Sequence, residues 1–435
     1  MIGCRAVSSD ITPLKPVPLA GFGNRSGNFG SVHDPLDANL IVLEQGKQRI
    51  AILSVDLLYF GSALQKCATE AALRFLSITP ENLLLGASHT HFAPSTDSDK
   101  PRLGAVDDDY LEATGDTIEA LFKQAADLPS SNVRMEIKSI QMHHTVNRRR
   151  YGWHIDPEAL RLVKGIYMAP NFAETVDDTA HVLRFVDEND TLQAVLWNYA
   201  CHPTGFPDIH SVSADFPGAV RVHIRKHFSS VVPVVFLQGF AGDKRPIELG
   251  GRIRLLGRIR RLVGGPHFGK FDRDTHAQWS EALTKNILET FNVKDAWRTI
   301  LPDLAVGRST LELADIVDGR TGTTVSPSPM TVQCIRLGHE ATIIALAAEP
   351  VSQYVGTITD AINIPKTNVI PVGCTDNVFG YLPTSDMARK GGYEVSGFFP
   401  AFNLSGQFND NFESRVINTV KQAYDLASQT QPSNS

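Results

Sequence analysis

The sequence predicts a single large α/β domain whose mixed β-sheets contain antiparallel hairpins and are flanked by helices. Two observations carry this prediction. Apolar runs with strand character alternate with helical apolar spacing from end to end, and neither an internal repeat nor a Pro/Ser-rich linker divides the chain. Three pairs of apolar runs are joined by short polar turns, which is typical of antiparallel hairpins. We expect the domain to span residues 1–427, followed by a disordered polar tail at 428–435.

The individual elements follow in order along the chain. The predicted hairpins pair 39–43 with 49–55, 182–186 with 192–200, and 330–337 with 341–347. Acidic residues at 107–109 precede the predicted helix 110–126, where they favour the positive end of the helix dipole. The remaining predicted helices are 62–76, 216–228, 276–291, 351–362 and 407–427, and the remaining buried strands are 82–87 and 231–237.

The composition is that of an ordinary soluble globular protein. The 435 residues are 42% hydrophobic and 20% charged, which excludes disorder over most of the length. A net charge of −6 (41 basic minus 47 acidic residues) argues against a nucleic-acid partner, and no apolar run is long enough to span a membrane. The N-terminus shows no signal peptide, and five scattered cysteines without a CxxC motif fit reduced thiols, so we expect a cytoplasmic protein.

Polar residues stand where predicted apolar strands end. His89 and His91 follow the strand 82–87, and His202 follows the strand 192–200 and precedes Pro203. Strand alternation directs residues i and i+2 to the same side, so His89 and His91 can both face a metal, or one can bind metal while the other transfers protons. Each histidine taken alone is equally explained as a loop or structural residue.

Two further residues extend the pattern. Glu349 follows the predicted strand 341–347, and a carboxylate there needs a cation or a hydrogen-bonding partner unless it serves the N-terminus of the next helix. Tyr381 lies in a Gly-rich aromatic loop that can approach a ligand closely or simply pack. Two histidines and a glutamate with an open position for water are a catalytic Zn²⁺ set. Such a set predicts hydrolysis through metal-activated water.

Taken together, these motifs resemble the neutral/alkaline (non-lysosomal) ceramidase family, in its N-terminal catalytic domain. The similarity spans about residues 1–430. The motifs that carry it are Asp10-Ile11-Thr12-Pro13, Gly21-Phe22-Gly23, Val55-Asp56, Ser88-His89-Thr90-His91, Asn147-Arg148-Arg149, Cys201-His202-Pro203, 239–243, Glu349-Pro350 and Gly380-Tyr381.

The resemblance implies roles for single residues. It implies one zinc ion bound by His89, His202, Glu349 and Tyr381, with His91 and Arg148 needed for activity and Tyr381 or Arg148 stabilising the oxyanion. The family cleaves the amide bond between a fatty acid and a sphingoid base. The implied activity is therefore a ceramidase-like zinc amidase acting on a small-molecule substrate.

Two departures from the family pattern bear on the substrate. Arg245 stands where the family has a serine, next to Lys244, and nothing in the sequence corresponds to the family's C-terminal immunoglobulin-like domain. A guanidinium and an ammonium suit an anionic group. We therefore expect Arg245 and Lys244 to bind a smaller, more polar or anionic acyl compound, through an amide or an ester bond. The alternatives are a true ceramidase and a non-catalytic binding protein that retains the fold.

The Arg-rich segment 251–261 permits three interpretations: a solvated amphipathic helix, a binding surface for an anionic substrate group, or a membrane-surface segment. A different metal hydrolase, the amidohydrolase barrel, would require eight regular βα units, and the predicted hairpins argue against it. The sequence leaves the oligomeric state open.

Overall fold

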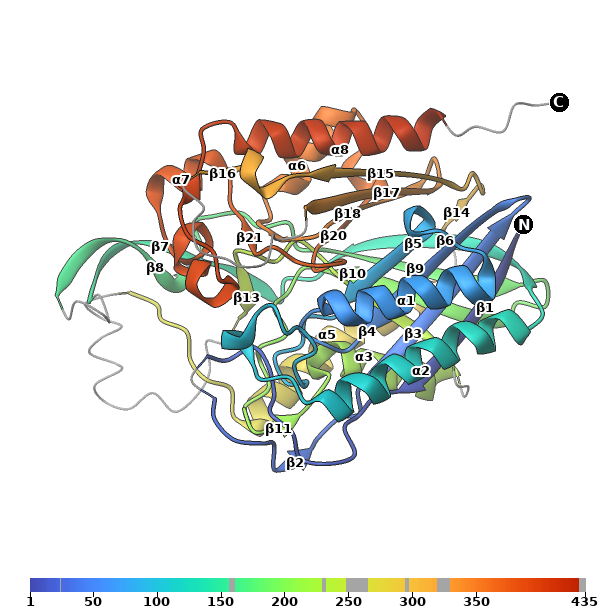
Figure 1. Cartoon of the computed structure of the whole chain (residues 1–435), viewed down its shortest axis with the longest axis horizontal. Helices are drawn as coiled ribbons and strands as arrows, with labels where there is room; N and C mark the ends of the chain where they lie inside the picture. Colours follow the sequence, from blue (N-terminus) through green and yellow to red (C-terminus); the bar gives the residue numbers. More distant parts are fainter. Residues whose placement is uncertain are drawn as a thin grey trace.

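The computed structural model describes residues 1–23, 25–155, 161–228, 232–247, 265–293, 297–318 and 329–429. Within these ranges the chain is a mixed α/β structure built on two large open sheets, as the sequence predicts (Figure 1). All three predicted hairpins are confirmed, as the pairs β3–β4, β9–β10 and β17–β18. The sheets are mixed, because β4–β5, β10–β12 and β18–β20 pair in parallel. The open sheets exclude the barrel alternative.

The larger sheet has nine strands among the described residues, in the order β12-β10-β9-β6-β1-β3-β4-β5, with β14 beside β6. It curves enough to bring β12 near β5, where a Cβ on Gly86 would lie 2.9 Å from Leu237 Cδ2, but no hydrogen-bonded ladder joins the two strands among the described residues. The strands are β1 (Ile2–Asp10), β3 (Asp37–Gln45), β4 (Gln48–Val55), β5 (Leu83–Ala87), β6 (Ser131–Gln141), β9 (Thr179–Asp187), β10 (Leu192–Tyr199), β12 (Val234–Gln238) and β14 (Arg298–Ile300).

The second sheet stacks on the first. Its order is β15-β17-β18-β20, and one buried cluster joins Leu43 and Ile52 of the first sheet to Ile343 and Val372 of the second. Because both faces of each sheet are covered, β3 and β18 read as continuous apolar runs rather than as alternating ones. The strands are β15 (Ala305–Leu311), β17 (Met330–Gly338), β18 (Ala341–Leu346) and β20 (Val369–Val372).

Helices cover the outer faces and give four layers. The first sheet carries α1, α2, α3 and α5, and the second carries α6 and α8, which lies along the upper edge of Figure 1. The side chain of Asp107 caps α2 by accepting a hydrogen bond from the Tyr110 amide (3.0 Å). The helices are α1 (Gly61–Leu76), α2 (Asp108–Asp127), α3 (Asp215–Phe228), α5 (Arg273–Asn292), α6 (Tyr354–Ile362), α7 (Ser385–Lys390) and α8 (Phe412–Gln429).

Smaller ladders complete the fold. The strands β7 (Thr145–Ile155) and β8 (Leu162–Asn171) form a hairpin that projects from the body in Figure 1, and β13 (Lys244–Pro246) pairs with its base. The other ladders are two-residue pairs: β2 (Ser31–Val32) with β11 (Ser211–Val212), β16 (Val317–Asp318) with β22 (Gln407–Phe408), and β19 (Glu349–Pro350) with β21 (Tyr381–Leu382).

Two predicted segments, the tail 428–435 and the Arg-rich segment 251–261, lie mostly or wholly outside the described residues. Helix α8 continues through Gln429, so Ser428 and Gln429 are helical and do not belong to the predicted tail, while 430–435 lie outside the described residues. The Arg-rich segment 251–261 also lies outside them. Across the described ranges, no helix combines the length and the apolar character needed to cross a membrane.

Candidate metal centre

The fold brings the predicted strand-end residues to one place. His89 follows β5 and His202 follows β10, while Glu349 begins the two-residue strand that comes after β18. Tyr381 is its direct partner in that ladder, where the Glu349 amide donates to the Gly380 carbonyl oxygen (2.8 Å). The segments that follow β5 and β10 therefore lie together, although the two strands are far apart in the order of the large sheet.

The functional atoms of four of these residues converge in the interior. His89 Nε2 lies 3.3 Å from His202 Nε2, and Glu349 Oε2 lies 3.3 Å from the first nitrogen and 3.2 Å from the second. The Tyr381 hydroxyl is 3.3 Å from His202 Nε2. All four side chains are at most 4% exposed, so solvent does not screen their interactions.

Backbone carbonyls fix the tautomers of the imidazoles. His89 Nδ1 lies 3.2 Å from the Leu58 carbonyl oxygen, and His202 Nδ1 lies 2.9 Å from that of Ala241. Carbonyl oxygens only accept hydrogen bonds, so each Nδ1 carries a proton, and in the neutral form of each ring the lone pair is on Nε2. The two Nε2 atoms and one carboxylate oxygen therefore face the same small space.

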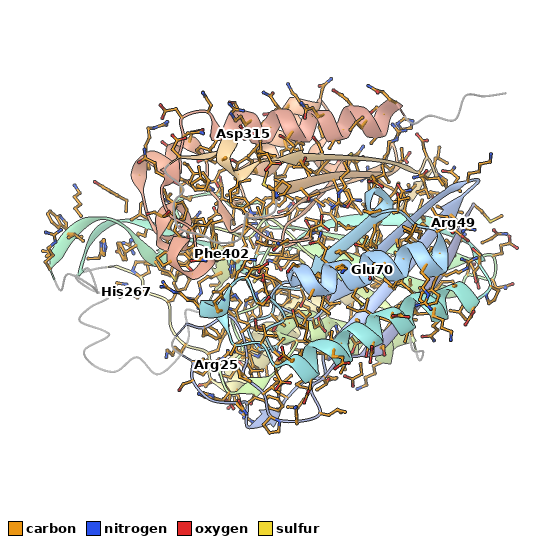
Figure 2. The ribbon with its side chains drawn as sticks, viewed as in Figure 1. Arg25, Arg49, Glu70, His267, Asp315 and Phe402 are labelled. Atoms are coloured by element: carbon orange, nitrogen blue, oxygen red, sulfur yellow. The ribbon has the colours of Figure 1, made fainter. Side chains whose placement is uncertain are left out.

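His91 completes a three-histidine cluster. Its Nδ1 donates to the Gly21 carbonyl oxygen (3.0 Å), and its Nε2 is buried without a hydrogen-bond partner among the described residues. One ring nitrogen from each of the three histidines lies within 4.8 Å of the others. Arg25, labelled in Figure 2, fastens this part of the site by donating to the carbonyl oxygens of Ala20 (2.8 Å) and His91 (2.7 Å).

Burial and neighbouring charges set the protonation states. Burial lowers the pKa of His202 to about 4, and burial together with the neighbouring imidazoles holds the pKa of His91 well below its usual value. Burial would raise the pKa of Glu349, but His89 and His202 outweigh it and bring that pKa well below its usual range. Burial acts to lower the pKa of His89, but the neighbouring Cys374 and Glu349 outweigh it and bring that pKa well above its usual value. The carboxylate is thus an anion beside a protonated His89 and the unprotonated nitrogens of His91 and His202.

The residues present fit a metal ion. Glu349 Oε2 is buried and has no hydrogen-bond partner among the described residues, although two imidazole nitrogens stand beside it. A buried carboxylate needs positive charge beside it, which protonated His89 supplies here and which a metal ion bound between the same atoms would supply in its place. Neutral imidazole and carboxylate are ligand types that catalytic metal sites use, and His89, His202 and Glu349 offer such atoms within 3.3 Å of one another, with the Tyr381 hydroxyl beside them. His91 stands close enough to serve as a ligand or as a proton carrier.

Sequence reasoning missed Tyr59. Its hydroxyl donates a short hydrogen bond to Glu349 Oε1, and its ring packs against His89 (5.2 Å between centroids) and Phe402. The bond occupies one carboxylate oxygen and leaves the other directed at the histidines. Tyr59 comes shortly after β4, so the strand-end rule that found the histidines also applies to it.

Arg148 enters the site from the base of the β7–β8 hairpin. Its guanidinium carbon lies 5.3 Å from the centre of the Tyr381 ring, and its Nη2 is buried without a hydrogen-bond partner. Glu394, which the sequence analysis did not single out, accepts from Arg148 Nε (2.8 Å) and Arg149 Nη1 (2.5 Å). Glu394 lies in a π-helical turn without a motif of its own, so only the tertiary contacts reveal it.

The two predicted substrate-binding cations lie in different surroundings. Lys244 is fully buried, and its ammonium contacts the backbone carbonyl of Asp177, so the structure does not bring it to an accessible surface. Arg245 is partly exposed, with its guanidinium carbon 4.9 Å from the Phe268 ring centre and Nη1 3.6 Å from Met168 Sδ.

Comparison with known structures decides the fold. The crystal structure of neutral ceramidase from Pseudomonas aeruginosa superposes with a TM-score of 0.74 at 16% identity, covering 100% of this chain and 76% of that one. A structure described as ceramidase complexed with C2 gives 0.75 at 15% identity with the same coverage. The chain has the neutral ceramidase fold. No family model and no curated protein sequence matches it, so the neutral ceramidase likeness is one of three-dimensional structure.

Proposed function

We propose that the protein is a zinc-dependent hydrolase that cleaves an amide or ester bond in a small, polar or anionic acyl compound. The observation that carries the proposal is the convergence of three buried atoms: Glu349 Oε2 lies 3.3 Å from His89 Nε2 and 3.2 Å from His202 Nε2. The neutral ceramidase fold supports a hydrolase, since the solved structures it matches are ceramidases.

The chain's own groups suit such a reaction. When bound, zinc supplies a Lewis acid that polarises a carbonyl and lowers the pKa of water. Because the pKa of His91 lies well below its usual value, its Nε2 is a proton acceptor at neutral pH. It takes the proton of the attacking water and returns it to the leaving nitrogen or oxygen as the acyl bond breaks. The donor for the oxyanion is Arg148 Nη2 or, where it does not bind the metal, the Tyr381 hydroxyl.

Arg245 distinguishes the proposed substrate from ceramide. A guanidinium in place of a serine favours an anionic group, and one charged hydrogen bond contributes about 1.5–3 kcal/mol. That energy corresponds to roughly ten- to hundredfold in kcat/KM. Lys244 is left out of this contact, because its ammonium is buried against Asp177. The cytoplasmic location expected from the sequence stays part of the proposal.

The test assays the zinc-loaded and the chelator-stripped protein against ceramide and against small polar N-acyl and O-acyl compounds. We expect zinc-dependent cleavage of a polar compound and a ten- to hundredfold loss of kcat/KM on Arg245→Ser. Arg74→Ser, an exposed change on α1, should have no effect. Efficient ceramide cleavage that Arg245→Ser leaves unchanged would favour the true-ceramidase alternative. Stoichiometric zinc without activity on any substrate would favour the non-catalytic alternative.

A further inference from the structure

A second site lies away from the metal centre, between the projecting β7–β8 hairpin and α7. A cavity of about 800 Å³ opens there, which is within the usual size range of small-ligand pockets. None of the four predicted metal ligands lines it. Its charged lining residues are Arg149, Lys164, Glu174, Asp386, Arg389 and Lys390.

The cavity carries a surplus of positive charge. Four of those residues are cationic and two are acidic, in a chain whose net charge is −6. Asp386 is shared by Lys390 (2.6 Å) and Arg389 (3.4 Å), so one carboxylate serves two cations. Lys164 has no acidic partner among the described residues, and its ammonium lies 5.5 Å from the centre of the Tyr151 ring. Anions are therefore attracted to this cavity.

The inner wall is preorganised. Arg149 is only 6% exposed and is fixed by Glu394 (2.5 Å) and by the Gly391 carbonyl oxygen (2.7 Å). A Cβ on Gly392 would come within 2.8 Å of Ile166 Cγ2 and 3.0 Å of Arg149 Nη1, so the loop is pressed closely against the hairpin. Gln353 adds a buried Oε1 without a hydrogen-bond partner, which a ligand hydroxyl or amine can satisfy.

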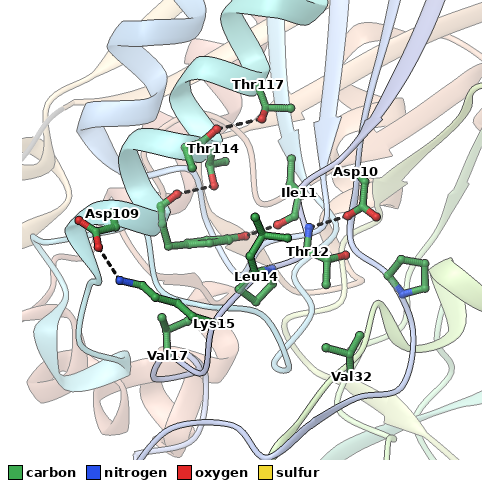
Figure 3. A pocket seen from close by; sticks show the side chains of 14 residues that line it. Asp10, Ile11, Thr12, Leu14, Lys15, Val17, Val32, Asp109, Thr114 and Thr117 are labelled. Atoms are coloured by element: carbon green, nitrogen blue, oxygen red, sulfur yellow. Dashed lines mark hydrogen bonds and ion pairs between the residues drawn. The ribbon is translucent and has the colours of Figure 1, made fainter.

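A second cavity of similar size does not have a positively charged lining. It measures about 810 Å³ and lies between the N-terminal loop and α2 (Figure 3). Lys15 is the only cation in its lining, and Asp109 already pairs with it (2.5 Å), while Asp10 leaves the lining net negative. The hairpin cavity therefore carries the positive surplus that this second cavity does not.

We propose that the cavity between β7–β8 and α7 binds a small organic dianion that also carries a hydrogen-bond donor. Lys164 and Arg389 contact the negative groups, Arg149 fixes the positive inner wall, and Gln353 Oε1 accepts from the donor. A phosphate monoester and a dicarboxylate share this chemistry. The inference does not depend on the reaction at the metal centre.

The test measures binding of inorganic phosphate and of malate to the full chain by titration calorimetry at low and moderate salt. We expect saturable binding of at least one probe, weakened tenfold or more in the Lys164→Gln/Arg389→Gln double variant. Lys285→Gln, an exposed change on α5, should bind as the wild type does. Phosphate also binds metals, so only the binding that the double variant loses relative to the wild type is assigned to the cavity.

The outcomes separate the possible ligands. Loss of phosphate binding alone in the double variant assigns a phosphate-bearing ligand, and loss of malate binding alone assigns a dicarboxylate. Gln353→Leu should weaken malate, which has a hydroxyl, and should leave succinate, which has none, unchanged. Equal binding by wild type and double variant, or no binding of either probe, would overturn the proposal.

Discussion

Tyr59 donates its hydroxyl hydrogen to Glu349 Oε1, the carboxylate oxygen that faces away from the two histidines. Burial and the adjacent Glu349 raise the pKa of Tyr59 well above its usual value, so the hydroxyl keeps its proton. The bond therefore fixes the carboxylate with Oε2 directed at His89 and His202. Partners of this kind orient metal ligands.

We predict that Tyr59→Phe weakens zinc binding by roughly 10–100-fold, because Glu349 is then free to rotate away. Competition with a chromogenic chelator measures the affinity. Tyr110→Phe is the matched control, since it also removes a buried tyrosine hydroxyl. That hydroxyl donates to the Ile11 carbonyl oxygen (3.0 Å) and not to a carboxylate of the site. Unchanged zinc affinity in Tyr59→Phe would show that the carboxylate is oriented by other contacts.

His91→Ala should separate metal binding from catalysis. Because the variant retains the proposed ligands His89, His202, Glu349 and Tyr381, we expect it to bind zinc while kcat/KM falls by about 10²–10⁴-fold. Elemental analysis and the acyl-substrate assay measure the two quantities on one preparation. His202→Ala should lose both. If His91→Ala also loses its zinc, His91 is a ligand and the division of roles is wrong.

Gly21→Ala should damage the site without changing any functional side chain. Gly21 has a φ of +102°, and a Cβ there would lie 2.5 Å from His91 Nδ1. The substitution therefore displaces either the imidazole or the carbonyl that orients it. We expect at least a tenfold loss of kcat/KM with the fold retained by circular dichroism. Gly23→Ala is the control, since a Cβ there meets nothing within 4 Å; equal activity of the two variants would contradict the prediction.

A buried histidine outside the site should make stability depend on pH. Burial lowers the pKa of His181 to about 4, although the charge of Asp177 acts to raise it. In the unfolded chain a histidine has a pKa near 6.5. Below pH 6.5 the unfolded chain binds a proton that the folded chain refuses, so stability falls as the pH falls from 6.5 towards 4.

Between pH 7 and 5 His181 should cost about 2 kcal/mol, at ~1.4 kcal/mol per pH unit. Urea unfolding at both pH values measures the change. His181→Gln should reduce this loss, while His223→Gln, which alters an exposed residue of α3, should not. Identical pH dependence in His181→Gln and the wild type would refute the assignment.

The sequence was a good guide wherever a local pattern decided the outcome. Runs such as 330–337 and 341–347, joined by a short polar turn, have few alternatives to a hairpin, and polar residues after such strands lie at sheet ends. It was a poor guide where distant segments meet. Glu394 gains its role only because its turn folds onto Arg148 and Arg149, and Lys244 is buried only because Asp177 lies over it.

The carbonyl oxygens of Gly21, Leu58 and Ala241 orient the three imidazoles, and this has an evolutionary consequence. An acceptor that belongs to the main chain survives replacement of the side chain attached to it. The hydrogen bonds therefore do not constrain the side chains at positions 58 and 241, which are limited only by their packing in the interior, whereas Gly21 is constrained by its conformation. A centre oriented by main-chain atoms depends on the path of the backbone, and this chain shares its fold with ceramidase structures at 15–16% identity, so comparing backbones is the better way to search for similar centres.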